Sequence, residues 1–203
     1  MNHIITVSRE FGSGGRELGK RLADALGFSY FDREIVTALA AETGLDEDYL
    51  ANSTEAGTLA QFPLHFARSF TQIPTVPNDT VKLMSMQTSL IKGLAEKGNC
   101  LIVGRAADAI LEDYAPFKIF VYADEQSKLA RCRKRAKEDE NLTDREMLRA
   151  MKRIDKARAE FHDIISEYRW GDKESYDLCI NTTDLEIKKV IPALADYIRS
   201  VVS

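Results

Sequence analysis

A run of glycines near the N-terminus has the composition of a phosphate-binding loop. Gly12–Gly15 follows a short apolar segment and leads into a stretch where Leu18, Leu22 and Leu26 recur on one face of a predicted helix. Glycines at a strand-to-helix turn let the backbone approach a phosphate closely, and the first amides of the helix then point at the anion. We therefore predict a phosphate site formed by Gly12, Ser13, Gly14, Gly15, Arg16 and Glu17.

The spacing after this loop favours a mononucleotide loop over a dinucleotide one. The dinucleotide pattern G-x-G-x-x-G needs a third glycine where Glu17 stands, although Asp32 follows at about the distance of a ribose-binding acid. The mononucleotide pattern G-x-x-x-x-G-K-[ST] matches the leucine spacing only if Gly15 takes the place of the lysine and Arg16 that of the hydroxyl residue. Arg16 or Arg9 would then supply the cation, since arginine grips phosphate with two parallel hydrogen bonds. A tight turn with a purely structural role is the remaining interpretation.

Charge is distributed unevenly along the chain. Residues 128–158 contain twelve Lys and Arg but six Asp and Glu, a net charge of +6, which leaves −10 for the rest of a chain whose total is −4. An acidic chain is a poor match for polymeric nucleic acid, which is held through many phosphate contacts, whereas one basic segment suits a small anion. A helix with a solvated basic face is the plainer interpretation of this segment.

Other compositional features argue against several classes of protein. No apolar run approaches the roughly 20 residues that span a bilayer, and the first ten residues lack the layout of a signal peptide. We therefore expect a cytoplasmic protein without membrane contact. The three cysteines form no C-x-x-C pair and the three histidines are scattered, which disfavours both a disulfide framework and a His/Cys metal site.

The elements that must position these residues alternate between strand and helix patterns. Apolar, β-branched segments predict strands at 3–7, 28–31, 100–103, 117–122 and 177–181. Helical periodicity predicts helices at 15–26, 33–42, 79–97, 125–138, 143–168 and 184–202. This alternation indicates βαβ units and a parallel sheet in a single domain spanning residues 1–203.

One connection does not fit this alternation. Residues 52–78 are too long for an ordinary link, and we interpret them as a mobile insertion on the substrate side. Phe62, Phe66 and Phe70 recur every four residues within it, which favours a short amphipathic helix. We interpret these rings as core packing or as the contact of a homodimer.

The order of several motifs along the chain resembles that of the cytidylate kinase-like family, a branch of the P-loop nucleoside monophosphate kinases. The motifs are SREFGSGGRELG at 8–19, YFDREIV at 30–36, LIVGRAAD at 101–108, VYADEQSKLARCRKR at 121–135, RIDKAR at 153–158 and YDLCINTT at 176–183. The resemblance covers nearly the whole chain. It implies a three-layer α/β sandwich of the P-loop NTPase type, with a five-stranded parallel sheet and a helical lid at about 131–145.

The resemblance also implies roles for individual residues. Around the phosphate acceptor it implies Asp32, Arg33, Arg105, Asp155 and Arg158, and near the adenine of ATP it implies Asn181 and Thr182. The cations that would align and neutralise the reacting phosphates are Arg16, Arg105, Arg131 and Arg135. The aspartate that follows the Gly-Arg pair in the family is Ala106 here, and Asp108 is the nearest acid.

Taken with the loop, the resemblance implies ATP-dependent phosphoryl transfer to a small acceptor, with CMP or dCMP as the expected acceptor and Mg²⁺ as the metal. Two alternatives stay open. Because the loop lacks its lysine, the chain is alternatively a nucleotide-binding sensor or scaffold without turnover. Because no tyrosine–arginine pair follows Asp32, the acceptor is alternatively a small molecule that is not a nucleotide.

Overall fold

The computed structural model describes residues 3–44, 47, 78–136 and 142–201. The insertion expected at 52–78, including the three phenylalanines assigned to a core or dimer contact, lies outside these residues apart from Asn78. The middle of the expected lid, at 137–141, lies outside them as well. The insertion, the dimer contact and the lid therefore stay predictions.

Five parallel strands form one sheet in the order β2-β3-β1-β4-β5. They are β1 (Ile4–Arg9), β2 (Ser29–Phe31), β3 (Cys100–Val103), β4 (Phe117–Tyr122) and β5 (Leu178–Asn181). In the central register, Val7 of β1 lies opposite Val103 on one side and Ile119 on the other. The expected five-stranded parallel sheet is confirmed. Its order puts β1 in the middle, so the glycine loop leaves the sheet at the centre of its carboxyl edge.

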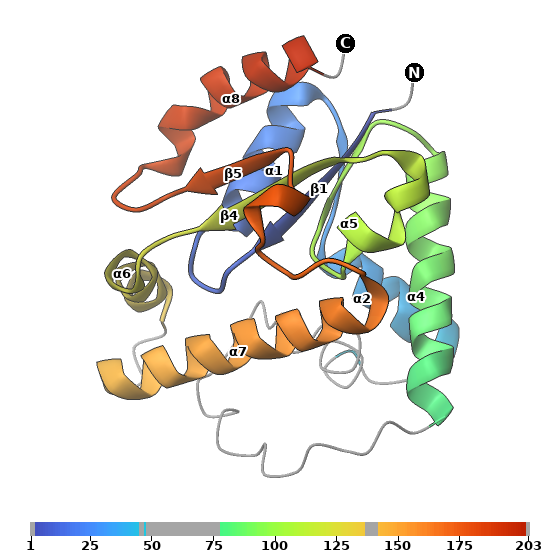
Figure 1. Ribbon diagram of the computed structural model, residues 1–203, viewed down its shortest axis with the longest axis horizontal. Coiled ribbons are helices and arrows are strands. Elements are labelled where there is room, and N and C mark those ends of the chain that lie inside the picture. The colour runs from blue at the N-terminus through green and yellow to red at the C-terminus, as the bar shows by residue number, and fades with distance from the viewer. Residues whose placement is uncertain (1–2, 45–46, 48–77, 137–141, 202–203) are drawn as a thin grey trace.

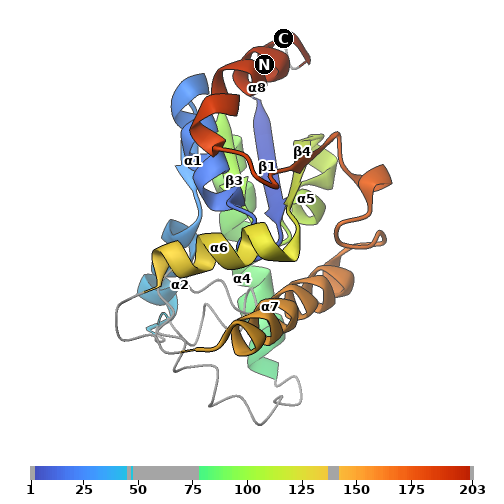
Figure 2. The ribbon, with the colours of Figure 1, turned by 90° about the vertical axis from the view of Figure 1, so that its left-hand side faces the viewer.

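Helices cover both faces of the sheet and complete the expected three-layer α/β sandwich (Figure 1). On one face lie α1 (Gly15–Leu26) and α8 (Ile187–Val201). On the other lie α2 (Arg33–Thr43), α4 (Asn78–Glu96) and the short α5 (Ala107–Ile110). Two further helices, α6 (Glu125–Arg135) and α7 (Asp144–Ile165), lie at the carboxyl end of the strands, as both ribbon views show (Figure 2). Single 3₁₀ turns occur at Glu112–Tyr114 and Lys173–Ser175.

The two faces of the sheet bury separate apolar clusters because successive side chains of a strand point to opposite sides. Ile5 and Val7 pack toward α1 and α8, where Leu18 and Leu22 are fully buried. Ile4 packs on the opposite face, toward α2, α4 and α5. Burial on both faces explains why the strands show little alternation in sequence. No helix within the described ranges is long and apolar enough to cross a bilayer.

The structure departs from the predicted elements at β1 and after β3. Strand β1 extends two residues further than expected, because Ser8 and Arg9 pair with Phe120 and Val121 of β4. Helix α5 was not expected. It follows a turn in which Gly104, Arg105 and Ala106 all have positive φ, at 72°, 63° and 49°. The apolar periodicity of the sequence does not predict such a turn.

Candidate active site

The glycine loop at residues 10–14 leaves the first turn of α1 open to an anion. Gly12 and Gly14 adopt φ values of 78° and 83°, which residues other than glycine rarely adopt. A Cβ atom on Gly14 would also lie 2.3 Å from Cδ1 of Ile187, so the loop and the start of α8 are in close contact. No side chain caps α1 at Gly14. The amide of Gly15 donates to the Ser13 hydroxyl at 3.4 Å, and the amides of Arg16 and Glu17 lie in the first turn of the helix, where phosphate binds in loops of this kind.

Hydrogen bonds from the end of β5 hold this loop in shape. The buried hydroxyl of Thr182 lies 2.6 Å from the carbonyl oxygen of Ser13, and the Ser13 hydroxyl donates to the carbonyl of Glu10 at 2.8 Å. Arg131 of α6 donates to the carbonyl of Thr182, which brings this expected lid arginine beside the loop. Asn181 is exposed, and its side-chain oxygen accepts the amide of Thr183 at 3.0 Å. Thr182 thus shapes the loop.

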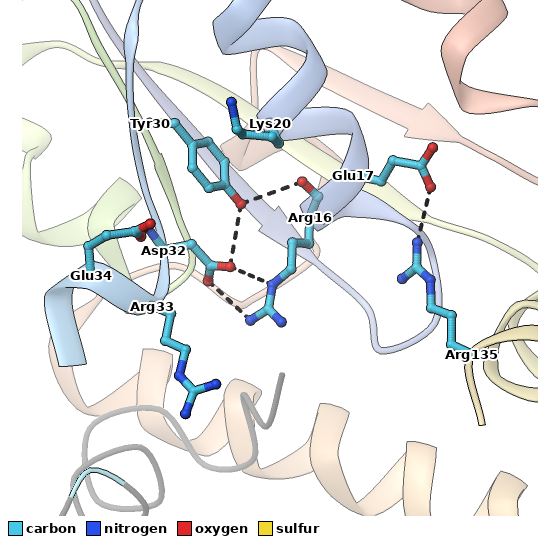
Figure 3. A pocket seen from close by; sticks show the side chains of 8 residues that line it. All are labelled: Arg16, Glu17, Lys20, Tyr30, Asp32, Arg33, Glu34 and Arg135. Carbon is cyan, nitrogen blue, oxygen red and sulfur yellow. Dashed lines mark hydrogen bonds and ion pairs between the residues drawn. The ribbon is translucent and has the colours of Figure 1, made fainter. Parts of the chain in front are cut away.

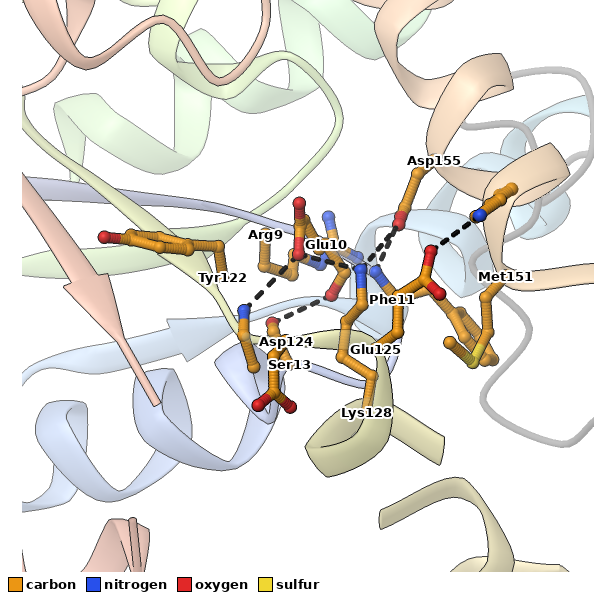
Figure 4. A network of polar contacts seen from close by, with 12 residues as sticks. Arg9, Glu10, Phe11, Ser13, Tyr122, Asp124, Glu125, Lys128, Met151 and Asp155 are labelled. Carbon is orange, nitrogen blue, oxygen red and sulfur yellow. Dashed lines mark hydrogen bonds and ion pairs between the residues drawn. The ribbon is translucent and has the colours of Figure 1, made fainter. Parts of the chain in front are cut away.

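Helices α6 and α7 are tied to the loop by a network of charges (Figure 4). Lys128 of α6 lies 2.9 Å from Glu10 and 3.8 Å from Asp155 of α7. The carboxylate of Asp155 accepts the amide of Phe11 at 2.6 Å. Arg158, one helical turn further along α7, donates to the carbonyl of Arg9 at 3.0 Å. Asp155 and Arg158, which the resemblance assigns to the acceptor, therefore hold the backbone of the loop in this structure.

Asp155 is expected to make stability depend on pH. Burial raises the pKa of its carboxyl from 3.8 to about 6, and Arg158, the Phe11 amide and Lys128 counteract this in part. The folded state therefore binds this proton more tightly than the unfolded state, so the contribution is fully present below pH 3.8 and is lost as pH rises through about 6. The unfolding free energy of the wild type, relative to Asp155→Asn, should fall by about 2–3 kcal/mol between about pH 4 and about pH 7. Urea unfolding across this range measures the difference, and a constant difference would contradict the assignment.

Three buried arginines from separate elements line one narrow pocket beside the loop. They are Arg9 at the end of β1, Arg105 in the turn after β3 and Arg158 on α7, at 5%, 1% and 6% exposure. The positive φ of Arg105 turns the chain directly after β3 and fixes where its side chain starts. The pocket has a volume of about 10 Å³, room for about one water molecule. This is a concentration of positive charge at the carboxyl edge, where ligands of parallel sheets bind.

A polar network behind these arginines was not foreseen from the sequence. Asp108 of α5 accepts a hydrogen bond from the Ser8 hydroxyl at 3.2 Å and lies 3.0 Å from Nε2 of His162. All three residues are at most 3% exposed, so the network ties β1, α5 and α7 together inside the protein. Asp108 thus has a defined position near the Gly-Arg turn. His162 belongs to none of the sequence motifs, so its contact with Asp108 could not be predicted.

A wider cleft of about 370 Å³ opens on the other side of the loop, between α1 and the end of β2 (Figure 3). Arg16 pairs with Asp32 through Nε and, at 3.2 Å, through Nη2, and the Tyr30 hydroxyl also contacts Asp32 at 3.3 Å. Arg33 extends toward Glu47 at 3.5 Å, and Arg135 from the end of α6 pairs with Glu17 at 3.0 Å. The guanidinium of Arg16 is therefore directed at the acid after β2.

The predicted residues thus fall into three groups around one edge of the sheet. The glycine loop, Thr182 and Arg131 lie together at the start of α1. Arg105 and Arg158 lie with Arg9 in the narrow pocket, while the cleft collects Arg16, Glu17, Asp32, Arg33 and Arg135. Asn181 stands apart, exposed at the end of β5. Glu10 and Lys128, which the sequence analysis did not single out, connect the loop to α6.

Potential metal ligands do not cluster in the part of the chain that the structure describes. No group of three or more His, Cys, Asp or Glu there is arranged to hold a metal ion. The Ser13 hydroxyl is used inside the loop, and Arg16 stands where a P-loop has its metal-binding hydroxyl.

Known proteins share this arrangement. The sequence profile of the cytidylate kinase-like family matches residues 4–184. The chain belongs to this family. None of the curated proteins compared with the chain matches it significantly. Membership of this family supports phosphoryl transfer and the use of a nucleotide in general terms, and it leaves the acceptor undefined.

Solved structures show the same fold as this member of the cytidylate kinase-like family. An uncharacterised protein from Eubacterium ventriosum is 25% identical, with a TM-score of 0.70 over 98% of this chain and 99% of its own. The shikimate kinase from Bacteroides thetaiotaomicron is 15% identical, with a TM-score of 0.59 and coverage of 98% and 99%. A sugar kinase from a Janibacter species is 11% identical, with a TM-score of 0.54 and coverage of 98% and 95%. At such identities the two kinases bear on the fold alone.

Proposed function

We propose that the protein transfers the γ-phosphoryl group of ATP to a small acceptor that itself carries a phosphate, with CMP or dCMP as the leading candidate. The observation that carries this proposal is the pocket lined by Arg9, Arg105 and Arg158 next to the glycine loop. Three buried arginines that line one pocket favour an acceptor with a multiply charged anion over an uncharged one. A small molecule suits the narrow pocket and the cleft of about 370 Å³, and an acidic chain is a poor match for polymeric nucleic acid.

In the proposed reaction an oxygen of the acceptor phosphate attacks the γ-phosphorus of ATP. A bond forms between that oxygen and the γ-phosphorus as the bond to the β–γ bridging oxygen breaks, and ADP leaves with the released electron pair. Such a transfer needs two polyanions aligned and their charge neutralised more than it needs covalent participation by the protein. Glycine-loop amides at the start of α1 would hold the ATP phosphates, and Arg105 would hold the acceptor.

The remaining predicted residues have roles consistent with where they lie. Arg131 is next to the loop, and its Nη1 atom is buried without a hydrogen-bond partner among the described residues, so it can turn that donor to a bound phosphate. Asp32 and Arg33 border the cleft and would contact the body of the acceptor. Because the arginine pocket admits about one water molecule, acceptor binding requires the wall formed by α7 to move outward. A lid at about 131–145 would accommodate such movement.

Mg²⁺ enters this proposal as part of the substrate MgATP. The ion is held by the phosphates and water, in keeping with its preference for several water ligands and with the lack of a protein-built site among the described residues. Activity should therefore require Mg²⁺ in proportion to ATP.

One observation favours a second candidate, a kinase whose acceptor is not a nucleotide. The resemblance assigns Asp155 and Arg158 to cytosine and phosphate. In the structure, Asp155 accepts a hydrogen bond from the amide of Phe11, and Arg158 donates one to the carbonyl of Arg9. If these bonds persist in the complex, no described acid remains there to read a cytosine ring. The shikimate and sugar kinases of the same fold accept small molecules of this other kind, by their names.

A transfer assay against a panel of acceptors tests the proposal. Purified protein with MgATP should release ADP when CMP or dCMP is added, and should do so more slowly with the other nucleoside monophosphates. Shikimate and simple sugars in the same panel test the second candidate. ATP binding in a calorimeter without transfer to any acceptor would overturn the proposal in favour of a nucleotide-binding sensor or scaffold.

A further inference from the structure

Two of the residues by which the loop departs from the P-loop pattern, Gly15 and Arg9, lie next to each other. Gly15 occupies the position of the P-loop lysine, and Arg9 that of the first glycine. A Cβ atom on Gly15 would lie 2.5 Å from Cβ of Arg9, 3.0 Å from its Cγ and 3.2 Å from Cβ of Val121. Contacts below 3.0 Å between backbone-fixed carbons are not tolerated, so no lysine fits at 15 while arginine stays at 9. The stem of Arg9 fills the space of a side chain at 15, and the two departures form one reciprocal exchange.

Arg9 is held within the site. It ends β1, is 5% exposed, and its carbonyl accepts the hydrogen bond from Arg158. It lines the narrow pocket and also acts on the cleft: burial and Asp32 raise the pKa of the Tyr30 hydroxyl, whereas Arg16 and Arg9 work in the opposite direction. Arg9 therefore lines the narrow pocket, packs its stem against Gly15 and is near enough to Tyr30 to affect that hydroxyl.

Arg16, the other cation considered for the loop, is engaged elsewhere. Its guanidinium forms two contacts with the carboxylate of Asp32, whose side chain is 5% exposed. Turning Arg16 toward the nucleotide would leave this carboxylate buried without its cation, which is costly. Arg16 thus organises the end of β2.

We propose that Arg9 takes over the work of the missing P-loop lysine, so that the cation for the terminal phosphates of ATP comes from the end of β1 and not from the start of α1. This inference rests on the proposed binding of ATP by the loop. Under this proposal, positions 9 and 15 are coupled. Arginine at position 9 leaves no room for a lysine at position 15, and the site keeps one positive charge either way.

A reciprocal exchange tests this coupling. The variants are Arg9→Gly, Gly15→Lys, the double variant Arg9→Gly/Gly15→Lys, and the double variant Arg9→Gly/Gly15→Ala. Gly93→Lys, in which the new Cβ meets nothing within 4 Å, is the matched control for adding a lysine. Calorimetric titration with MgATP measures affinity, and thermal unfolding reports whether each variant folds.

We expect Arg9→Gly and Gly15→Lys each to weaken ATP binding at least about tenfold, the first by losing the charge and the second by steric conflict. The lysine double variant should recover affinity to within about threefold of the wild type, since it restores the first glycine and the lysine of the P-loop pattern. The alanine double variant should melt close to the lysine double variant but bind ATP no better than Arg9→Gly. Gly93→Lys should bind ATP as the wild type does.

Failure has two distinguishable forms. Wild-type affinity in Arg9→Gly, or equal ATP affinity in the two double variants, would overturn the role of Arg9 and leave the proposed function intact. Failure of the wild type itself to bind MgATP would overturn the proposed function and this inference together.

Discussion

Replacing Arg105 with methionine is expected to lower kcat/KM for the phosphorylated acceptor by about 10²–10³-fold, the usual cost of removing one donor to a developing anion. Arg105 is 1% exposed, starts from a backbone turn with φ of 63°, and lines the pocket shared with Arg9 and Arg158. Methionine retains much of the apolar volume and loses the charge and the planar fork. Steady-state kinetics at varied acceptor concentration, with MgATP saturating, measures the effect.

Two comparisons separate a role in acceptor binding from a role in folding. Arg105→Lys keeps the charge but not the paired hydrogen bonds, so its kcat/KM should fall between the wild type and Arg105→Met. Arg199→Met removes an exposed arginine at the far end of α8 and should leave kcat/KM unchanged. The affinity for MgATP should stay within about threefold in all three variants, because Arg105 is assigned to the acceptor. An Arg105→Met enzyme that folds and turns over normally would remove Arg105 from the site.

Replacing Asp108 with alanine is expected to lower the free energy of unfolding by about 3–5 kcal/mol. The carboxylate of Asp108 accepts a hydrogen bond from the Ser8 hydroxyl and also pairs with Nε2 of His162, and all three residues are buried. Alanine would leave both partners without this acceptor in a region that excludes water, and it would release α7 from α5. Urea unfolding followed by circular dichroism measures the loss.

Conservative and exposed substitutions calibrate this effect. Asp108→Asn retains an oxygen for Ser8, so it should cost about half as much as the alanine variant. Asp113→Ala removes an exposed aspartate from the neighbouring 3₁₀ turn and should change the unfolding free energy by less than about 0.5 kcal/mol. If Asp108→Ala were as mild as Asp113→Ala, the buried network would not support the site.

Elements with a strong local pattern could be predicted to the residue. The helix at 15–26 and the strands at 100–103 and 117–122 have the boundaries that apolar periodicity and β-branched runs indicate. Helix α5 was not predicted because it has only four residues and no capping side chain, and because two non-glycine residues of positive φ, Arg105 and Ala106, precede it. Short elements held by such turns derive their stability from packing and have no period to detect.

The candidate site divides in the same way. The glycine loop carries its own sequence signal, because backbone geometry at its glycines depends on the residue type, and the Gly-Arg pair was indicated by the family resemblance. The interaction partner of each charged side chain, by contrast, could not be predicted from the sequence. Arg16 meets Asp32, Asp155 meets the amide of Phe11 across 144 positions, and Arg9 shares a pocket with Arg105 and Arg158, all through the packing of strands and helices.

By itself, then, the sequence determined a parallel α/β sheet and membership of the cytidylate kinase-like family, and it predicted a phosphate-binding loop after the first strand. The sheet and the predicted loop follow from local conformational preference and hydrophobic pattern, which act over a few residues, whereas the family follows from the order of the motifs along the chain. Only the tertiary structure decided that Arg16 serves Asp32 and that Arg9 fills the space beside Gly15. Which cation is near the loop depends on volume and charge among residues distant in the chain, and these residues come together only when β1, α1 and α7 pack.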